Sequence, residues 1–111
     1  RSTKITDVGI RELKNLTYLE YWTCHGITDD GIKELKCLTS FNCGGSKKIT
    51  NKGIKELKSL TYLDCSGCKN VTIEIIKELK KLEVLRCYNC RFENQLRDNF
   101  QTDILGQFIR K

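Results

Sequence analysis

Apolar residues recur along this chain at a fixed spacing of 22 residues. A fixed period of this length indicates a repeat protein, in which one unit cannot bury its apolar side chains alone and stacked units can. We divide the chain into repeats 5–26, 27–48, 49–70 and 71–92, within a single domain 1–111. The apolar positions that keep the spacing are Ile5, Ile27, Ile49 and Val71; Ile10, Ile32, Ile54 and Ile76; Leu13, Leu35, Leu57 and Leu79; and Leu16, Leu38, Leu60 and Leu82.

The second part of each repeat has the alternating pattern of a β-strand. The four copies read LTYLEYWTC (16–24), LTSFNCGGS (38–46), LTYLDCSGC (60–68) and LEVLRCYNC (82–90). Since successive side chains of a strand point to opposite faces, we expect Leu63 and Cys65 to point into the core. Tyr62, Asp64 and Ser66 should then point outward.

The first part of each repeat follows the phrase I-T-x-x-G-I-K-E-L-K, which predicts a helix. Thr50 or Asn51 is the expected N-cap of the third copy. Ile54, Leu57 and Leu60 should share one helical face. In this phrase Gly9, Gly31 and Gly53 give way to Ile75, which we attribute to the absence of a following repeat that would crowd the last helix.

One strand and one helix in every 22 residues predict an α/β fold of the leucine-rich-repeat kind. We expect a right-handed solenoid, with parallel strands on its concave face and helices on its convex face. Residues 93–111 break the period, and Leu96, Phe100, Ile104 and Phe108 recur every four residues. This spacing predicts a C-terminal helical cap. No N-terminal cap is visible, so we expect the first strand to be an exposed edge or to lie against missing chain. The N-terminus lacks a Met, and we interpret it as a processed end or as part of a longer chain.

The repeats resemble the cysteine-containing leucine-rich-repeat family. The residues that carry the resemblance are Cys24, Cys68 and Cys90 at the ends of the strand segments, and the phrase ITDDGI at 27–32, echoed at 5–10 and 49–54. The resemblance covers residues 4–92. Similar repeats occur in the F-box proteins of ubiquitin ligases and in small accessory subunits of mitochondrial assemblies, and the family implies protein binding without chemistry.

Two departures from the family pattern matter. The repeats here have 22 residues, whereas the family more often uses about 26. No F-box stands before the repeats, which weakens the link to ubiquitin ligation.

Composition narrows the class of protein further. The chain is 39% apolar and 31% charged, a composition that excludes intrinsic disorder. The sequence contains no run of about 18 apolar residues, so no membrane-spanning segment is predicted. The formal charge is +6, which favours anionic partners without identifying a nucleic-acid binder. An odd count of 7 Cys and the lack of a signal peptide favour an intracellular, reducing compartment, either cytoplasm or nucleus, with an organelle matrix as a further setting.

The cysteines offer three interpretations. Cys65-x-x-Cys68 and Cys87-x-x-Cys90 match the spacing of a zinc template. The repeat explains the same spacing, because the equivalent positions in the first two repeats hold Tyr21 with Cys24 and Cys43 with Ser46. We favour small core side chains over a metal site, with zinc and disulfides between neighbouring repeats as the alternatives.

No catalytic constellation emerges from the sequence. Cys24 and His25 are adjacent, and adjacent side chains on an extended chain point apart. The sequence GSKK at 45–48 lacks the glycine spacing of a phosphate-binding loop. We therefore expect no enzyme activity, no cofactor, no metal and no small-molecule substrate.

The outward positions of the strands are the candidate binding residues. In a solenoid they lie side by side on the concave face, and aromatic residues and Arg dominate binding hot spots. We predict that this face docks a protein partner or a larger assembly, as a scaffold or adaptor would; the alternative is that Tyr18 and Trp22 cover an exposed edge. The predicted partner-binding residues are Tyr18, Glu20, Trp22, Tyr62, Asp64, Arg86 and Tyr88.

The convex face carries charge in columns. Two basic columns flank an acidic one, which predicts lateral Lys–Glu pairs on a solvated face. The alternative function is an RNA- or ribonucleoprotein-associated subunit that uses these strips and the loop at Lys47 and Lys48. The columns are Arg11, Lys33, Lys55 and Lys77; Lys14, Lys36, Lys58 and Lys80; and Glu12, Glu34, Glu56 and Glu78.

Overall fold

The computed structural model describes residues 5–20 and 26–111 and has a mixed α/β fold. Its described part holds four short α-helices and a six-stranded sheet. The helices are α1 (Asp7–Arg11), α2 (Asp29–Ile32), α3 (Asn51–Ile54) and α4 (Ile73–Glu78), with a 3₁₀ helix η2 at Glu93–Leu96. The strands are β1 (Tyr18–Leu19), β2 (Ser40–Asn42), β3 (Tyr62–Asp64), β4 (Val84–Arg86), β5 (Phe100–Thr102) and β6 (Phe108–Arg110).

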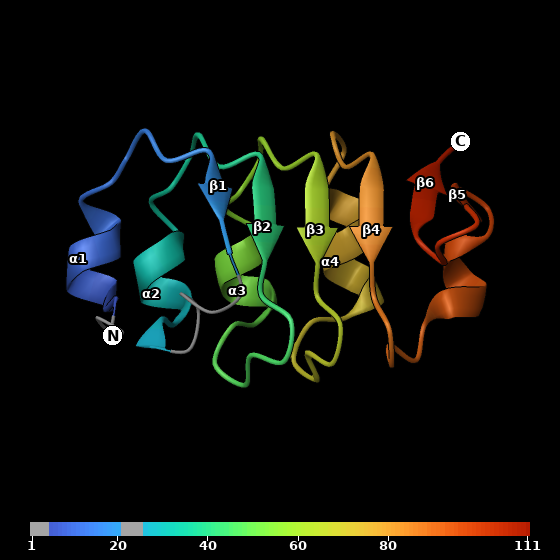
Figure 1. Cartoon of the computed structure of the whole chain (residues 1–111), viewed down its shortest axis with the longest axis horizontal. Coiled ribbons are helices and arrows are strands. Elements are labelled where there is room, and N and C mark those ends of the chain that lie inside the picture. Colours follow the sequence, from blue (N-terminus) through green and yellow to red (C-terminus); the bar gives the residue numbers. More distant parts are fainter. Residues whose placement is uncertain (1–4, 21–25) are drawn as a thin grey trace.

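The sheet has the order β1-β2-β3-β4-β6-β5. The first four strands are parallel, and each residue pairs with the residue 22 positions later, as Ser40 does with Tyr62 and Tyr62 with Val84. β6 joins β4 antiparallel, and β5 joins β6 antiparallel. In Figure 1, α3 and α4 lie behind the parallel strands, whose front face no helix covers, and α1 and β6 lie near opposite ends of the long axis.

The core lies between the parallel strands and the helices. The predicted alternation is confirmed in β3, since Leu63 and Cys65 are fully buried whereas Tyr62, Asp64 and Ser66 are partly exposed. The apolar columns of the sequence supply most of the core. Its largest fully buried side chains are Phe41, Ile27, Ile32, Leu35, Leu38, Ile49, Ile54, Leu57, Leu60, Leu63, Ile76 and Leu82.

The helices are shorter than the sequence pattern predicts. The N-cap at Thr50 is confirmed, and its hydroxyl accepts a hydrogen bond from the Lys52 N–H at 3.1 Å. The prediction that Leu57 and Leu60 lie on the helix is wrong, because α3 ends at Ile54. Two tight turns follow, with Leu57 N–H donating to Ile54 O and Leu60 N–H to Leu57 O. These turns bury both leucines without extending the helix.

Neighbouring segments are joined by an acid or amide at the start of each helix. The Asp29 carboxylate accepts hydrogen bonds from both the N–H and the hydroxyl of Thr50, at 2.8 and 2.5 Å. Asp7 binds Thr28 in the same way. Each contact satisfies a backbone donor at the N-terminus of the next helix, where no intrahelical acceptor exists.

These acids explain two of the three glycines of the column, Gly31 and Gly53, and they correct the predicted cause. A Cβ on Gly53 would overlap the Asp29 carboxylate, and one on Gly31 would overlap that of Asp7. The crowding therefore comes from the preceding segment and not from a following one. A Cβ on Gly9 would meet no heavy atom of the described chain closer than Thr6 Oγ1 at 3.9 Å.

The predicted C-terminal helical cap is wrong. After η2, residues 100–110 form the β5–β6 hairpin, whose Phe100 and Phe108 are buried whereas Ile104 in its loop is fully exposed. The spacing of four arises here because a turn separates two short strands that each bury one phenylalanine. Arg110 anchors the hairpin by donating to the carbonyls of Leu82 and Leu79, at 2.5 and 3.1 Å.

The longest helix among the described residues, α4, has six residues. None of these helices is long and apolar enough to cross a bilayer.

Candidate protein-binding face

The candidate site is the face of the sheet opposite the helices, which we call the open face. Its side chains come from alternate strand positions, so their neighbours follow from the strand register. One row across the strands, the aromatic row, has the partners Tyr18, Ser40, Tyr62, Val84 and Ile109. Tyr18 is 54% exposed and the other four are partly exposed. This row presents mainly aromatic and aliphatic surface to solvent.

A second row, the polar row, lies two residues further along the strands. Asn42, Asp64 and Arg86 are partners in it. Asn42 accepts a hydrogen bond from the Gly44 N–H at 2.9 Å, and Asp64 accepts one from the Ser66 N–H at 3.0 Å. These local turns fix both side chains at the ends of their strands, which lowers the entropic cost of presenting them.

Asp64 and Arg86 also form an ion pair across the strands. The Arg86 Nε lies 3.7 Å from an Asp64 carboxylate oxygen, and the two side chains are 32% and 14% exposed. A partly exposed pair of this kind contributes little to stability on its own. Its main effect is to hold the guanidinium in one orientation above the sheet.

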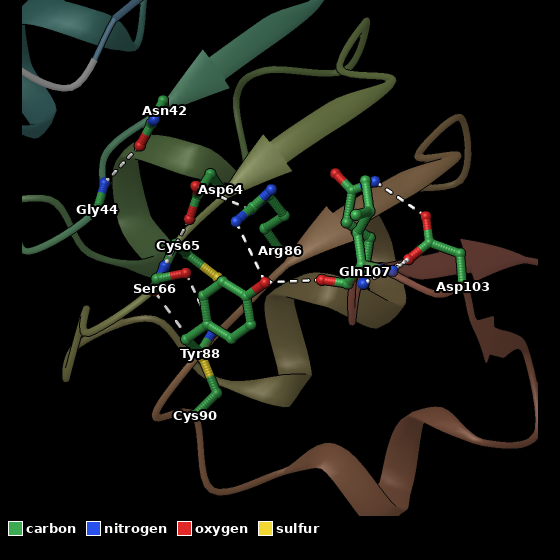
Figure 2. Close-up of polar contacts among 11 residues, drawn as sticks. Asn42, Gly44, Asp64, Cys65, Ser66, Arg86, Tyr88, Cys90, Asp103 and Gln107 are labelled. Carbon is green, nitrogen blue, oxygen red and sulfur yellow. Dashed lines mark hydrogen bonds and ion pairs between the residues drawn. The ribbon is translucent and has the colours of Figure 1, made fainter.

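Tyr88 connects this network to the C-terminal hairpin. The Arg86 guanidinium lies 5.0 Å from the centre of the Tyr88 ring, and its Nη2 donates to the phenol oxygen at 3.2 Å. The phenol in turn donates to the Leu105 carbonyl at 2.8 Å. Figure 2 shows Asp64, Arg86 and Tyr88 in sequence, with the hairpin residues Asp103 and Gln107 beside them. The Tyr88 phenol is therefore held by Arg86 and by the hairpin, while the residue stays 44% exposed.

Two further tyrosines of the open face interact with carboxylates. The Tyr18 hydroxyl donates to the Glu20 carboxylate. Burial, and then the negative charge of Asp64, raises the pKa of Tyr62. A tyrosine is neutral at physiological pH even without this shift, so the Tyr62 phenol can serve a partner as a hydrogen-bond donor.

The structure brings most of the predicted partner-binding residues to this one face. Tyr18, Tyr62, Asp64 and Arg86 lie on it in register, Glu20 hydrogen-bonds to Tyr18, and Tyr88 interacts with Arg86. Trp22 lies outside the described residues. That these side chains bind a partner stays a prediction.

Ile109 was not among the predicted residues, and it extends the aromatic row through the antiparallel hairpin. The alternation of Phe108, Ile109 and Arg110 was the available signal for that strand, and the helical spacing concealed it. The contact of Tyr88 with Leu105 carries no sequence signal, because it depends on the position of a loop.

The predicted core cysteines are buried as expected: Cys43, Cys65, Cys68 and Cys87 are at most 5% exposed. Cys90 is half-buried and Cys37 is exposed, and none of the six described cysteines forms a disulfide. Within residues 5–20 and 26–111, no three His, Cys, Asp or Glu side chains are arranged to hold a metal ion. Cys24 and His25 lie outside the described residues.

The predicted charge columns pair only in part. Lys36 lies 3.1 Å from the Glu56 carboxylate of the next segment, as the predicted lateral pairing requires. This pair lowers the pKa of Glu56, first through the hydrogen bond from Lys36 and then through its charge. The other ion pair of these columns in the described chain, between Lys33 and Asp30, joins residues three positions apart at the C-terminal end of α2.

No protein-family model matches the chain, and a search of curated proteins finds none that is significantly similar.

Proposed function

We propose that this chain is a leucine-rich-repeat solenoid that binds a protein partner on the open face of its sheet and carries out no chemistry. The observation that carries the proposal is the aromatic row: side chains 22 residues apart in sequence lie side by side on a face that no helix covers. Regular parallel strands of this kind form the concave surface of a leucine-rich-repeat solenoid. Partners of such proteins dock across the strands.

Several side chains of the open face are already held in place by contacts within the chain. Tyr88 and Arg86 hold each other, and Asp64 is fixed by its turn and by Arg86. Binding then costs less conformational entropy than it would with free rotors. Tyrosine and arginine in this state are the residues that most often dominate interface energetics.

The charge of the open face favours a protein over a nucleic acid. Its polar row and Glu20 contribute two carboxylates and one guanidinium, whereas the whole chain carries +6. A phosphate backbone would meet excess negative charge here. We expect a partner segment with apolar side chains over the aromatic row and hydrogen-bond donors toward Glu20.

The alternative, an RNA-associated subunit that uses the convex face, has less support. Basic columns are present, but Glu56 sits beside Lys36 and lies between further lysines. Interleaved carboxylates weaken a continuous phosphate track.

The experiment has two steps. The native partner is first isolated with the full chain as bait, and the affinity of that complex is then measured for variants. Tyr62→Ala should weaken it by more than about 1 kcal/mol. Lys58→Ala, an exposed change on the convex face, should leave the affinity unchanged.

A salt titration of the wild-type complex separates the two functions. An aromatic interface should keep its affinity across a fourfold rise in salt, whereas phosphate contacts lose it steeply. Loss of affinity in Lys58→Ala together with a steep salt dependence would overturn the proposal in favour of the RNA-associated function.

A further inference from the structure

Three cysteines, Cys65, Cys87 and Cys90, lie close together after the carboxyl ends of β3 and β4. The proposed protein binding does not use them. Cys65 follows β3 and Cys87 follows β4, and both are buried. Cys90 stands in the turn after β4 and is the half-buried member. The cluster therefore has one thiol that solvent can reach and two that it cannot.

Backbone geometry places Cys90 against the preceding segment. Asn89 has a φ of 66°, a left-handed conformation that Asn adopts more readily than most residues. It turns the chain back, so that the Cys90 N–H donates to the Cys87 carbonyl at 3.2 Å. The Cys90 sulfur then lies 3.8 Å from the Cys65 carbonyl oxygen. Cys65, Tyr88 and Cys90 are drawn together in Figure 2.

The same diagonal relationship occurs one segment earlier. Cys68 is 25 residues from Cys43, as Cys90 is from Cys65, and the Cys68 thiol donates to the Cys43 carbonyl at 2.9 Å. The two sulfurs of that pair are 3.8 Å apart. A disulfide bond requires a sulfur–sulfur distance of about 2.05 Å. Small side-chain movements would therefore bring the sulfurs of Cys43 and Cys68 to bonding distance. The two pairs differ in how far solvent reaches the later cysteine, because Cys68 is only 5% exposed whereas Cys90 is half-buried.

We propose that Cys90 is an oxidation-sensitive thiol that reacts with hydroperoxides and is then captured by Cys65 as a disulfide linking the third and fourth segments. The accessible thiol reacts first, and the buried thiol against it resolves the product. Cys87 lies in the same turn, where its carbonyl accepts the Cys90 N–H at 3.2 Å.

The thiol chemistry agrees with these roles. Hydrogen bonds from Cys65 and then Cys87 lower the pKa of Cys90 to about 4. The Cys90 hydrogen bond and burial raise the pKa of Cys65. Since the thiolate is the nucleophile, Cys90 is the reactive member at neutral pH and Cys65 stays protonated.

The reaction balances with the hydroperoxide as the oxidant. The Cys90 thiolate attacks the terminal peroxide oxygen, the O–O bond breaks, and the other oxygen leaves with a proton from solvent as water or an alcohol. Cys90 is now a sulfenic acid. The Cys65 sulfur attacks the Cys90 sulfur, the S–O bond breaks, and the departing hydroxide takes the Cys65 proton as water. Two thiols have lost two electrons to one peroxide.

Tryptic mapping of the full chain tests the proposal. The reduced protein is treated with an equimolar amount of hydrogen peroxide, the remaining thiols are alkylated, and the chain is digested. Cleavage after Lys58 and Lys69 releases Cys65 and Cys68 together, and cleavage after Arg86 and Arg91 releases Cys87 and Cys90 together. The expected product is peptide 59–69 joined to peptide 87–91.

Serine variants assign the bond. Cys68→Ser and Cys87→Ser should keep the cross-link. Cys90→Ser should lose it, and Cys65→Ser should lose it while Cys90 becomes trappable by dimedone as the sulfenic acid. Circular dichroism checks that each variant is folded, and the wild-type map stands even if one is not.

Three results would overturn the proposal. One is an internal disulfide within peptide 87–91 as the main product, and another is a cross-link that persists in Cys65→Ser. The third is oxidation of the exposed Cys37 while Cys90 stays reduced.

Discussion

Asp29 accepts two hydrogen bonds from Thr50, which stands 21 residues later and caps the next helix. Asp7 and Thr28 repeat the contact on one side. On the other side the residue is Asn51, whose amide oxygen accepts from the Thr72 N–H at 2.9 Å and whose amide nitrogen donates to the Thr72 hydroxyl at 2.7 Å. The structure therefore uses a carboxylate and an amide interchangeably at this joint between segments.

Replacing Asp29 tests the energetic weight of the joint. Asp29→Ala removes both acceptors and leaves the part-buried Thr50 N–H without them, so we expect a loss of about 2 kcal/mol in the free energy of unfolding. Urea denaturation followed by circular dichroism measures it.

Asp29→Asn is the matched control for that variant. Because Asn51 performs the same task with Thr72, the amide should retain most of the stability and lose less than about 1 kcal/mol. Equal losses in the alanine and asparagine variants would contradict the role given to this contact.

Two glycines at equivalent positions should respond in opposite ways to alanine. Gly53→Ala places a methyl group where the Asp29 carboxylate lies, and we expect it to destabilise the protein by about 2 kcal/mol through overpacking. Gly9→Ala meets only Thr6 Oγ1, at 3.9 Å. It should be neutral or stabilise by up to about 1 kcal/mol, since alanine is the better helix former. Thermal unfolding of the two variants side by side measures the difference; a destabilised Gly9→Ala would count against this explanation.

These glycines show how much of the stacking of segments could be predicted from the sequence. Their period was visible, and it identified the positions where segments stack. The residue that crowds each glycine could not be predicted, because the sequence does not show whether the Asp29 side chain contacts the preceding or the following segment. Periodicity gives the spacing of contacts between segments and leaves the three-dimensional direction of each contact undetermined.

The C-terminal hairpin can be distinguished from a helix by two substitutions. Phe100→Ala empties a buried position and should cost about 3 kcal/mol. Ile104→Ala changes a fully exposed loop residue and should stay within about 0.5 kcal/mol. In a helix with the predicted spacing both side chains would share the apolar face, so similar losses in urea denaturation would support the helix over the hairpin.

The hairpin loop should also respond to acid. Asp103 accepts hydrogen bonds from Gln107 and Leu105, and the Gln107 side chain and backbone, in that order, lower its pKa. A lowered folded pKa means that the stabilisation is present above the ordinary aspartate pKa of about 3.9 and is lost as pH falls through the lower folded value. As the pH is lowered through this range, we expect the urea concentration at the unfolding midpoint of the wild type to decrease. Asp103→Asn should show a flatter acid profile, and an unchanged profile would argue against this network.

The candidate site was predictable to the extent that strand alternation governs it. Tyr62, Asp64 and Arg86 could be placed on one face because a strand alternates and the period of 22 aligns neighbouring strands. The bonds of Tyr88 to Arg86 and Leu105 could not be anticipated. They depend on a hairpin whose short strands imitate helical spacing, and on side-chain rotamers that a sequence does not encode locally.

Side-chain footprinting of the partner complex tests most directly whether the open face is the binding surface. Hydroxyl-radical labelling reports on Tyr18 and Tyr62, and lysine acetylation reports on the convex residues Lys58 and Lys80. If the open face binds the partner, both tyrosines should lose reactivity in the complex while both lysines keep theirs. Protected lysines with unchanged tyrosines would contradict it.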